Sequence, residues 1–82
     1  MADALTMARA HRDGLRARVE QARKRKAAAD AAFQRVPPHD GRAQQDAGAE
    51  RDEARRELET LEAALPSAEQ ALAELERATP AR

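Results

Sequence analysis

The sequence predicts an all-α protein whose 82 residues form a single domain, an antiparallel two-helix coiled-coil hairpin. Two long segments consist mainly of strong helix formers (Ala, Arg, Glu, Leu and Gln), and neither shows the two-residue alternation of a β-strand. One strong break, Pro37 to Gly41, separates these segments. Apolar residues recur every seven positions on both sides of the break, which is the pattern of a coiled coil.

We expect the first helix over about residues 4–36. With Leu5 at heptad position a, Val19 and Phe33 also fall at a, and Leu15 and Val36 fall at d, without an interruption. At a rise of about 1.5 Å per residue this helix is roughly 50 Å long. A helix of this length needs a partner of equal length against which to bury its apolar stripe.

The turn is expected over residues 37–41. Its two prolines cannot continue a helix, and Asp40 can cap the next helix by accepting a backbone N–H. Because so short a connection leaves the chain no room to return, the two helices must run antiparallel.

The second helix is expected over about residues 41–78, with Pro66 inside it. Proline removes one helical hydrogen bond, so either the helix kinks there or a short third helix begins, for which Ser67 and Gln70 form a capping box. The leucines on both sides of Pro66 keep one heptad phase, which favours a kinked continuation.

The predicted seam pairs like heptad positions, so that Val19 meets Leu58, and Phe33 meets Gln44 near the turn. The large apolar residues of this hairpin seam are Leu5, Leu15, Val19, Phe33, Val36, Leu58, Leu61, Leu65, Leu72 and Leu75.

Charge is divided unequally along the chain. Residues 1–42 hold ten Lys or Arg and five Asp or Glu, and residues 43–82 hold five and ten, so the halves carry net charges of +5 and −5 and attract each other. The basic stretch RARVEQARKRK, residues 16–26, therefore serves mainly to bind the other half of the chain. The ion pairs expected to flank the seam are Arg9 with Glu69, Arg16 with Glu62, Arg18 with Glu57 and Arg25 with Glu50. Exposed pairs contribute about 0.2 to 1 kcal/mol each, so they select the partner and its direction more than they stabilise it.

Toward the turn the seam holds small residues and two cations, Lys26 and Arg51, which face each other at one layer. These cations either lie along the surface of a thin coil or belong to a weak tip that becomes ordered on a partner. The candidate partner-binding tip comprises Ala22, Lys26, Ala29, Phe33 and Arg51.

Alanines also mark the outer faces of both helices. They are either helix-promoting filler or the faces on which two hairpins dimerise into a four-helix bundle. These residues are Ala10, Ala17, Ala27, Ala28, Ala31, Ala49, Ala63 and Ala73.

The composition argues against catalysis. The chain has no cysteine and one aromatic residue, Phe33; His11 and His39 form no metal-binding motif, and no glycine-rich phosphate loop is present. We therefore expect no enzyme activity, cofactor, metal or small-molecule substrate. Because no apolar run is long enough to cross a bilayer and the first residues lack the pattern of a signal peptide, we also expect no membrane partner and a cytoplasmic location.

The expected function is protein–protein interaction, by an adaptor, small co-chaperone or assembly factor that binds another protein or a second copy of itself. One alternative is a nucleic-acid-binding hairpin dimer that uses the basic face of the first helix, formed by Arg9, Arg12, Arg16, Arg23 and Lys24. The other is a purely structural coiled-coil rod.

In length, heptads and central turn the chain resembles three groups of small bacterial helical hairpins. They are the RNA-binding hairpin dimers that control plasmid copy number, the co-chaperones of type III secretion needle subunits, and the stalk-like coiled coils of the same export apparatus. The resemblance implies a bacterial hairpin protein, for example one that belongs to a secretion-type apparatus. It assigns no function to any single residue of this chain.

Overall fold

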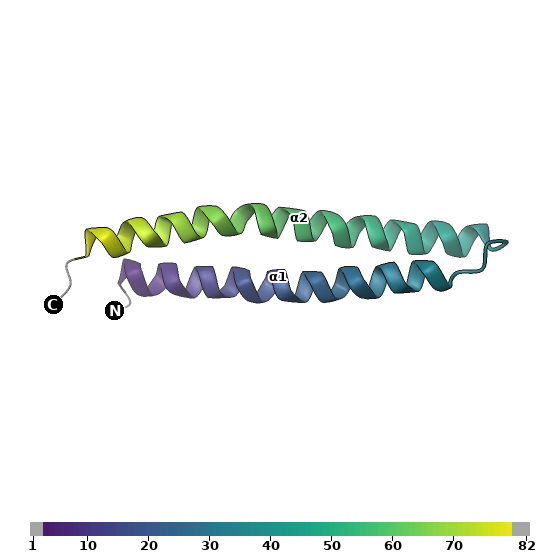
Figure 1. The fold of residues 1–82 in the computed structure, drawn as a ribbon, viewed down its shortest axis with the longest axis horizontal. Coiled ribbons are helices and arrows are strands. Elements are labelled where there is room, and N and C mark those ends of the chain that lie inside the picture. Colours follow the sequence, from purple (N-terminus) through teal and green to yellow (C-terminus); the bar gives the residue numbers. More distant parts are fainter. Residues whose placement is uncertain (1–2, 80–82) are drawn as a thin grey trace.

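A computed structural model describes residues 3–79, which form two antiparallel helices in a rod of 66 × 18 × 16 Å (Figure 1). Helix α1 spans Ala4–Arg35 and helix α2 spans Gly41–Ala78. These bounds agree to within one residue with the predicted helices. The predicted fold class, an all-α two-helix hairpin, is confirmed.

Both helices begin at an aspartate that caps the first turn. Asp3 accepts a hydrogen bond from the backbone N–H of Thr6 at 2.7 Å, and Asp40 accepts one from the N–H of Ala43 at 3.0 Å. The bond from Thr6 also lowers the pKa of Asp3, because it favours the ionised carboxylate. The hydrogen bond from the N–H of Ala43 confirms the cap predicted at Asp40.

The turn begins one residue earlier than predicted, at Val36. This residue has an extended backbone, with φ −69° and ψ 129°, because the following proline disfavours the helical region. The N–H of Asp40 donates to the carbonyl of Pro37 at 3.1 Å and closes the turn. The extended start carries the chain past the end of α1, so that the first turn of α2 lies beyond that end (Figure 1).

Helix α2 continues through Pro66, so the alternative of a short third helix is wrong. Pro66 lies at an exposed position, where its ring meets solvent. The carbonyl of Glu62 has no helical N–H to accept from, because proline lacks the donor. In Figure 1 the ribbon of α2 is gently bowed along its length.

The core is a narrow line between the helices. Ala54 is 0% exposed and Ala22 is 1% exposed, because small side chains let the helices approach closely. The buried hydrophobic residues are Leu15, Val19, Ala22 and Ala29 from α1, and Ala54, Ala68 and Leu72 from α2. The other predicted seam residues are half-buried, namely Leu5, Phe33, Val36, Leu58, Leu61, Leu65 and Leu75. Two helices alone leave one side of most seam side chains open.

Candidate interaction surfaces

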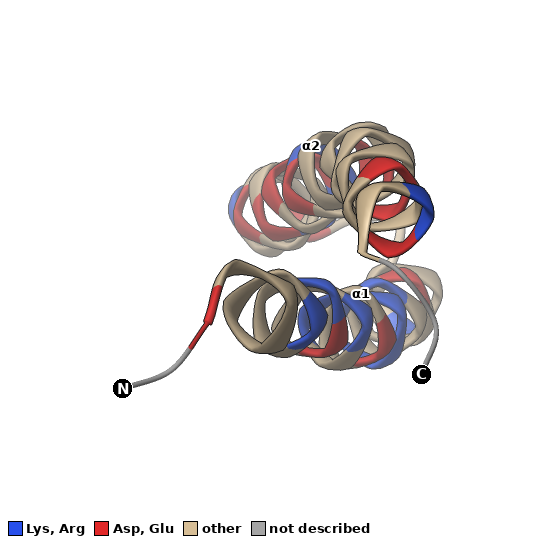
Figure 2. Ribbon diagram, turned by 90° about the vertical axis from the view of Figure 1, so that its left-hand side faces the viewer, with Lys and Arg blue, Asp and Glu red and all other residues tan. Residues whose placement is uncertain are grey.

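Two salt bridges close one side of the seam. Arg16 contacts Glu69 at 3.2 Å, and Arg23 contacts Glu62 at 3.3 Å. The prediction paired Glu69 with Arg9 and Glu62 with Arg16, so each acid binds the arginine one heptad further along α1. Figure 2 shows the charge division behind these contacts, with most basic positions on α1 and most acidic positions on α2.

The path of the turn explains this correction of the register. Because the extended turn places the start of α2 beyond the end of α1, Arg16 and Arg23 lie beside parts of α2 that are closer to the C-terminus of α2 than predicted. Phe33 shows the same displacement: a Cβ built on Gly48 would lie 3.6 Å from its ring, whereas the predicted partner was Gln44. When α2 is displaced by about one turn along α1, an arginine of α1 lies between two glutamates of α2 that are seven residues apart. Its long side chain can reach either glutamate.

On the opposite side of the seam, Arg25 binds three acids. Its guanidinium contacts Glu50 at 2.9 Å, as predicted, and it also binds Glu57 and reaches Glu53 at 3.6 Å. The prediction that Arg18 binds Glu57 is wrong. The hydrogen bond from Arg25 lowers the pKa of Glu50, and the bonds to Glu50 and Glu57 raise the pKa of Arg25.

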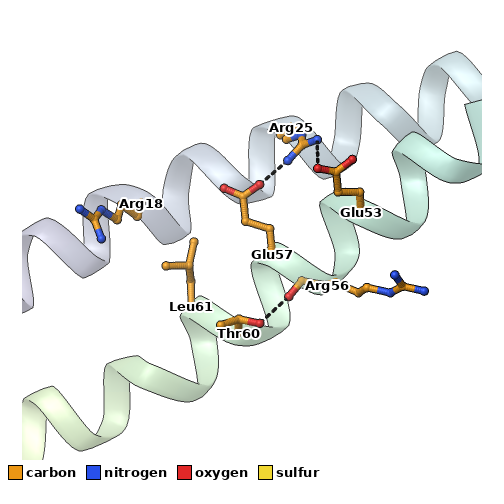
Figure 3. Close-up of a pocket in the computed structure, with 7 residues that line it drawn as sticks. All are labelled: Arg18, Arg25, Glu53, Arg56, Glu57, Thr60 and Leu61. Carbon is orange, nitrogen blue, oxygen red and sulfur yellow. Dashed lines mark hydrogen bonds and ion pairs between the residues drawn. The ribbon is translucent and has the colours of Figure 1, made fainter.

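A groove of about 670 Å³ lies beside this cluster (Figure 3). Its lining consists of Arg18, Arg25, Glu53, Arg56, Glu57, Thr60 and Leu61. Among the described residues, Arg18 and Arg56 form no salt bridge, and Figure 3 shows neither directed at the acids that Arg25 binds. The groove therefore contains two cations that are available to an outside acid.

At the tip, the two cations expected to face each other are each held by another group. Lys26 contacts Asp30 at 2.9 Å, one helical turn away, and the guanidinium of Arg51 lies 3.9 Å from the centroid of the Phe33 ring. The second contact is a cation–π interaction. Of the candidate partner-binding tip, Ala22 and Ala29 are buried between the helices, so the closed hairpin presents only the other three residues at its surface.

A smaller hollow of about 280 Å³ lies near the tip. It is lined by Lys26, Asp30, Arg51, Asp52 and Arg55. Its charges largely satisfy one another, since Arg55 also reaches Asp52 at 3.8 Å.

The two sides of the seam differ at the end of the rod that holds the termini. On the side closed by Arg16 and Glu69, α2 presents a glutamate at every seventh position, the last being Glu76. On the side of Arg25, the equivalent positions of α2 are exposed alanines, Ala64, Ala71 and Ala78. Because alanine carries no charge, α2 cannot form a salt bridge across the second side of the seam at these three positions.

Helix α1 contributes little charge to the same side. Ala4 and His11 occupy the matching heptad positions, and Met7 lies between them at helical spacing. Met7 is 63% exposed and is the large hydrophobic residue most open to solvent among those described. We call this surface the alanine flank and define it by Ala4, Met7, His11, Ala64, Ala71 and Ala78.

The alanine flank lies outside the sites predicted from the sequence, although the sequence holds a signal for it. Alanine recurs every seven residues at Ala64, Ala71 and Ala78, while glutamate recurs every seven residues on the other side of the same helix. The alanines predicted to form a dimer interface lie instead on the outer faces of the helices. The contact of Lys26 with Asp30 was also missed, and its signal is the spacing of four residues.

No family model, curated protein or solved structure gives a significant match to the chain. Among the described residues, no group of three or more His, Asp or Glu side chains is placed to hold a metal ion. Neither α1 nor α2 contains an apolar stretch long enough to cross a membrane.

Proposed function

We propose that this hairpin is a non-enzymatic protein–protein interaction module, an adaptor, small co-chaperone or assembly factor of the cytoplasm, and that its alanine flank receives a helix of the partner protein. The observation that carries the proposal is the difference between the two sides of the seam. One side is closed by Arg16 with Glu69 and Arg23 with Glu62, and the other is uncharged over the alanine flank.

The width of the apolar face on α2 supports the same function. Near the C-terminus of α2, apolar residues fill three of the seven heptad positions, a, d and g. A coiled-coil seam needs only two of them, whereas three are typical of a helix that faces a bundle. Helix α1 covers part of this face, so Leu61 and Leu75 remain half-buried beside the exposed alanines. A further helix on this side would complete their burial.

The basic face of α1 favours protein over nucleic acid as the partner. Arg16 and Arg23 contact glutamates of α2, and Arg12 contacts Asp13 at 2.9 Å. Three of the five cations proposed to bind phosphates are therefore already paired within the chain. The formal net charge of zero also provides no long-range attraction for a polyanion.

An affinity-capture comparison tests the proposal. The wild-type hairpin and two variants, Ala71→Glu on the alanine flank and Ala63→Glu on the outer face of α2, are immobilised separately and exposed to a lysate. Both positions are exposed alanines of one helix, so each variant adds the same charge at a different side. A protein retained by the wild type and by Ala63→Glu, and lost with Ala71→Glu, is the expected result. Retention of the same proteins by Ala71→Glu would show that the flank is not the docking surface. Retained nucleic acid that elutes as salt is raised would favour the nucleic-acid alternative.

A further inference from the structure

We infer that the partner on the alanine flank is a second copy of this chain, which packs antiparallel to the first and forms a four-helix bundle with the two tips pointing outward. This inference rests on the proposed function, because it names the occupant of the proposed docking surface. Three features of the hairpin carry it: the area that it exposes, the order of large and small residues along the flank, and the charges at the ends of the flank.

The exposed area exceeds that of a compact protein of the same mass. The hairpin exposes 6284 Å², whereas the usual scaling gives about 4,900 Å² for 9.0 kDa. The excess of about 1,400 Å² is larger than the roughly 800 Å² that each partner contributes to an interface of standard size. The hairpin therefore exposes enough extra surface to supply its side of an interface of standard size.

The large and small side chains along the flank follow an order that suits a reversed copy. In chain order this side of α2 presents half-buried Leu61, then three alanines at 64, 68 and 71, then half-buried Leu75 and exposed Ala78. A copy turned end for end sets Leu61 of one chain opposite Ala78 of the other, and Leu75 opposite Ala64. Leucine then packs against alanine toward both ends of the overlap, and Ala71 meets Ala68 at its middle, so no two leucines clash. The overlap of residues 61–78 is about 26 Å long.

The same reversal brings opposite charges together. At the end of the flank nearer the middle of the rod, Arg18 and Arg56 line the groove, and neither forms a salt bridge among the described residues. Toward the outer end, Glu74 lies one turn from Ala71 and Ala78 on the helix surface. Arg18 and Leu61 line the same groove. Once Leu61 faces Ala78 of the second copy, Arg18 therefore lies within about one helical turn, measured along the rod, of that copy's Glu74. The twofold symmetry repeats this pairing at the other end, as an isologous interface requires.

Light scattering on a size-exclusion column, from micromolar to millimolar protein, tests the inference. We expect the wild type to reach twice 9.0 kDa as concentration rises. The variant Ala71→Glu places a carboxylate from each copy in the interface, so its dissociation constant should rise at least about tenfold. The matched variant Ala63→Glu should dimerise as the wild type does. A wild type of single mass at all concentrations, a mass other than twice that of the chain, or a dimer unaffected by Ala71→Glu would each overturn the inference.

If Ala71→Glu loses its helical circular dichroism, the variant is unfolded and cannot report on dimerisation. Crosslinking of the folded chain then tests the inference. The chain has no native cysteine, so a single introduced thiol reports one position. A short bismaleimide should join copies that carry Ala71→Cys and not copies that carry Ala63→Cys, and the reverse result would overturn the inference. A monomeric wild type that still captures another protein through the flank would overturn the dimer and leave the proposed function standing. A monomeric wild type that captures no protein through the flank would overturn both the dimer and the proposed function.

Discussion

Replacement of Leu72 by alanine should cause the largest loss of stability among single leucine truncations in this chain. Leu72 is 2% exposed, so it is buried more completely than any other described leucine. The change removes three carbon atoms, each worth about 0.8 kcal/mol of transfer free energy, or about 2.4 kcal/mol in total. A cavity term adds to this, but a thin coil relaxes more readily than a globular core, so we expect about 2.5 to 3 kcal/mol. For a chain of this size the total unfolding free energy is about 4 to 12 kcal/mol.

Thermal unfolding followed by helical circular dichroism, at one fixed protein concentration, measures this loss. A loss of about 2.5 kcal/mol lowers Tm by roughly 10 to 20 °C in a domain of this length. The control is Leu58→Ala, because Leu58 occupies the seam of the same helix but is only half-buried. It should cost about half as much. Equal effects of the two substitutions, or a loss below about 1 kcal/mol for Leu72→Ala, would refute the burial on which the calculation depends.

Three further predictions concern the helix ends, the proline and the Arg25 cluster. Asp40→Ala removes the cap of α2 and should lower stability by about 1 kcal/mol, whereas Asp40→Asn should retain most of it; equal melting temperatures for the two variants would contradict this. Pro66→Ala restores a helical hydrogen bond and should raise stability by up to about 3 kcal/mol in urea unfolding, and an unchanged midpoint would mean that the helix has already adapted to the proline. Arg25 holds the pKa of Glu50 below its usual 4.5, so the pair stabilises the fold fully above that pH and loses its effect as pH falls through the lowered value. Between about pH 6 and about pH 3 the Tm of the wild type should therefore fall further than that of Glu50→Gln, and parallel curves would show that the pair does not contribute.

The proposed dimer changes how these experiments are compared. A dimer that dissociates on unfolding has a Tm that rises with protein concentration. Substitutions in the seam, such as Leu72→Ala, should lower Tm at every concentration. Substitutions on the alanine flank, such as Ala71→Glu, should mainly remove the dependence on concentration. The two surfaces can therefore be separated by melting each variant at several concentrations.

Local sequence alone determined the two helices, their bounds and their antiparallel direction. The reason is that each of these depends on a few neighbouring residues: Pro37 and Pro38 end the first helix, Asp40 caps the second, and the heptads mark one apolar stripe on each. The continuation through Pro66 followed from the phase of the leucines on both sides of it.

Only the tertiary structure decided which residues of the two helices meet. The ion pairs differ by less than about 1 kcal/mol between neighbouring registers, so charge pattern alone cannot choose between Glu62 and Glu69 as the partner of Arg16. The choice depends on how far the extended turn carries the chain before α2 begins, which is a property of the three-dimensional path. The distance between the helices then sets which side chains are buried. That distance leaves Leu61 and Leu75 half-covered beside the alanine flank, whereas a heptad pattern marks every seam residue alike.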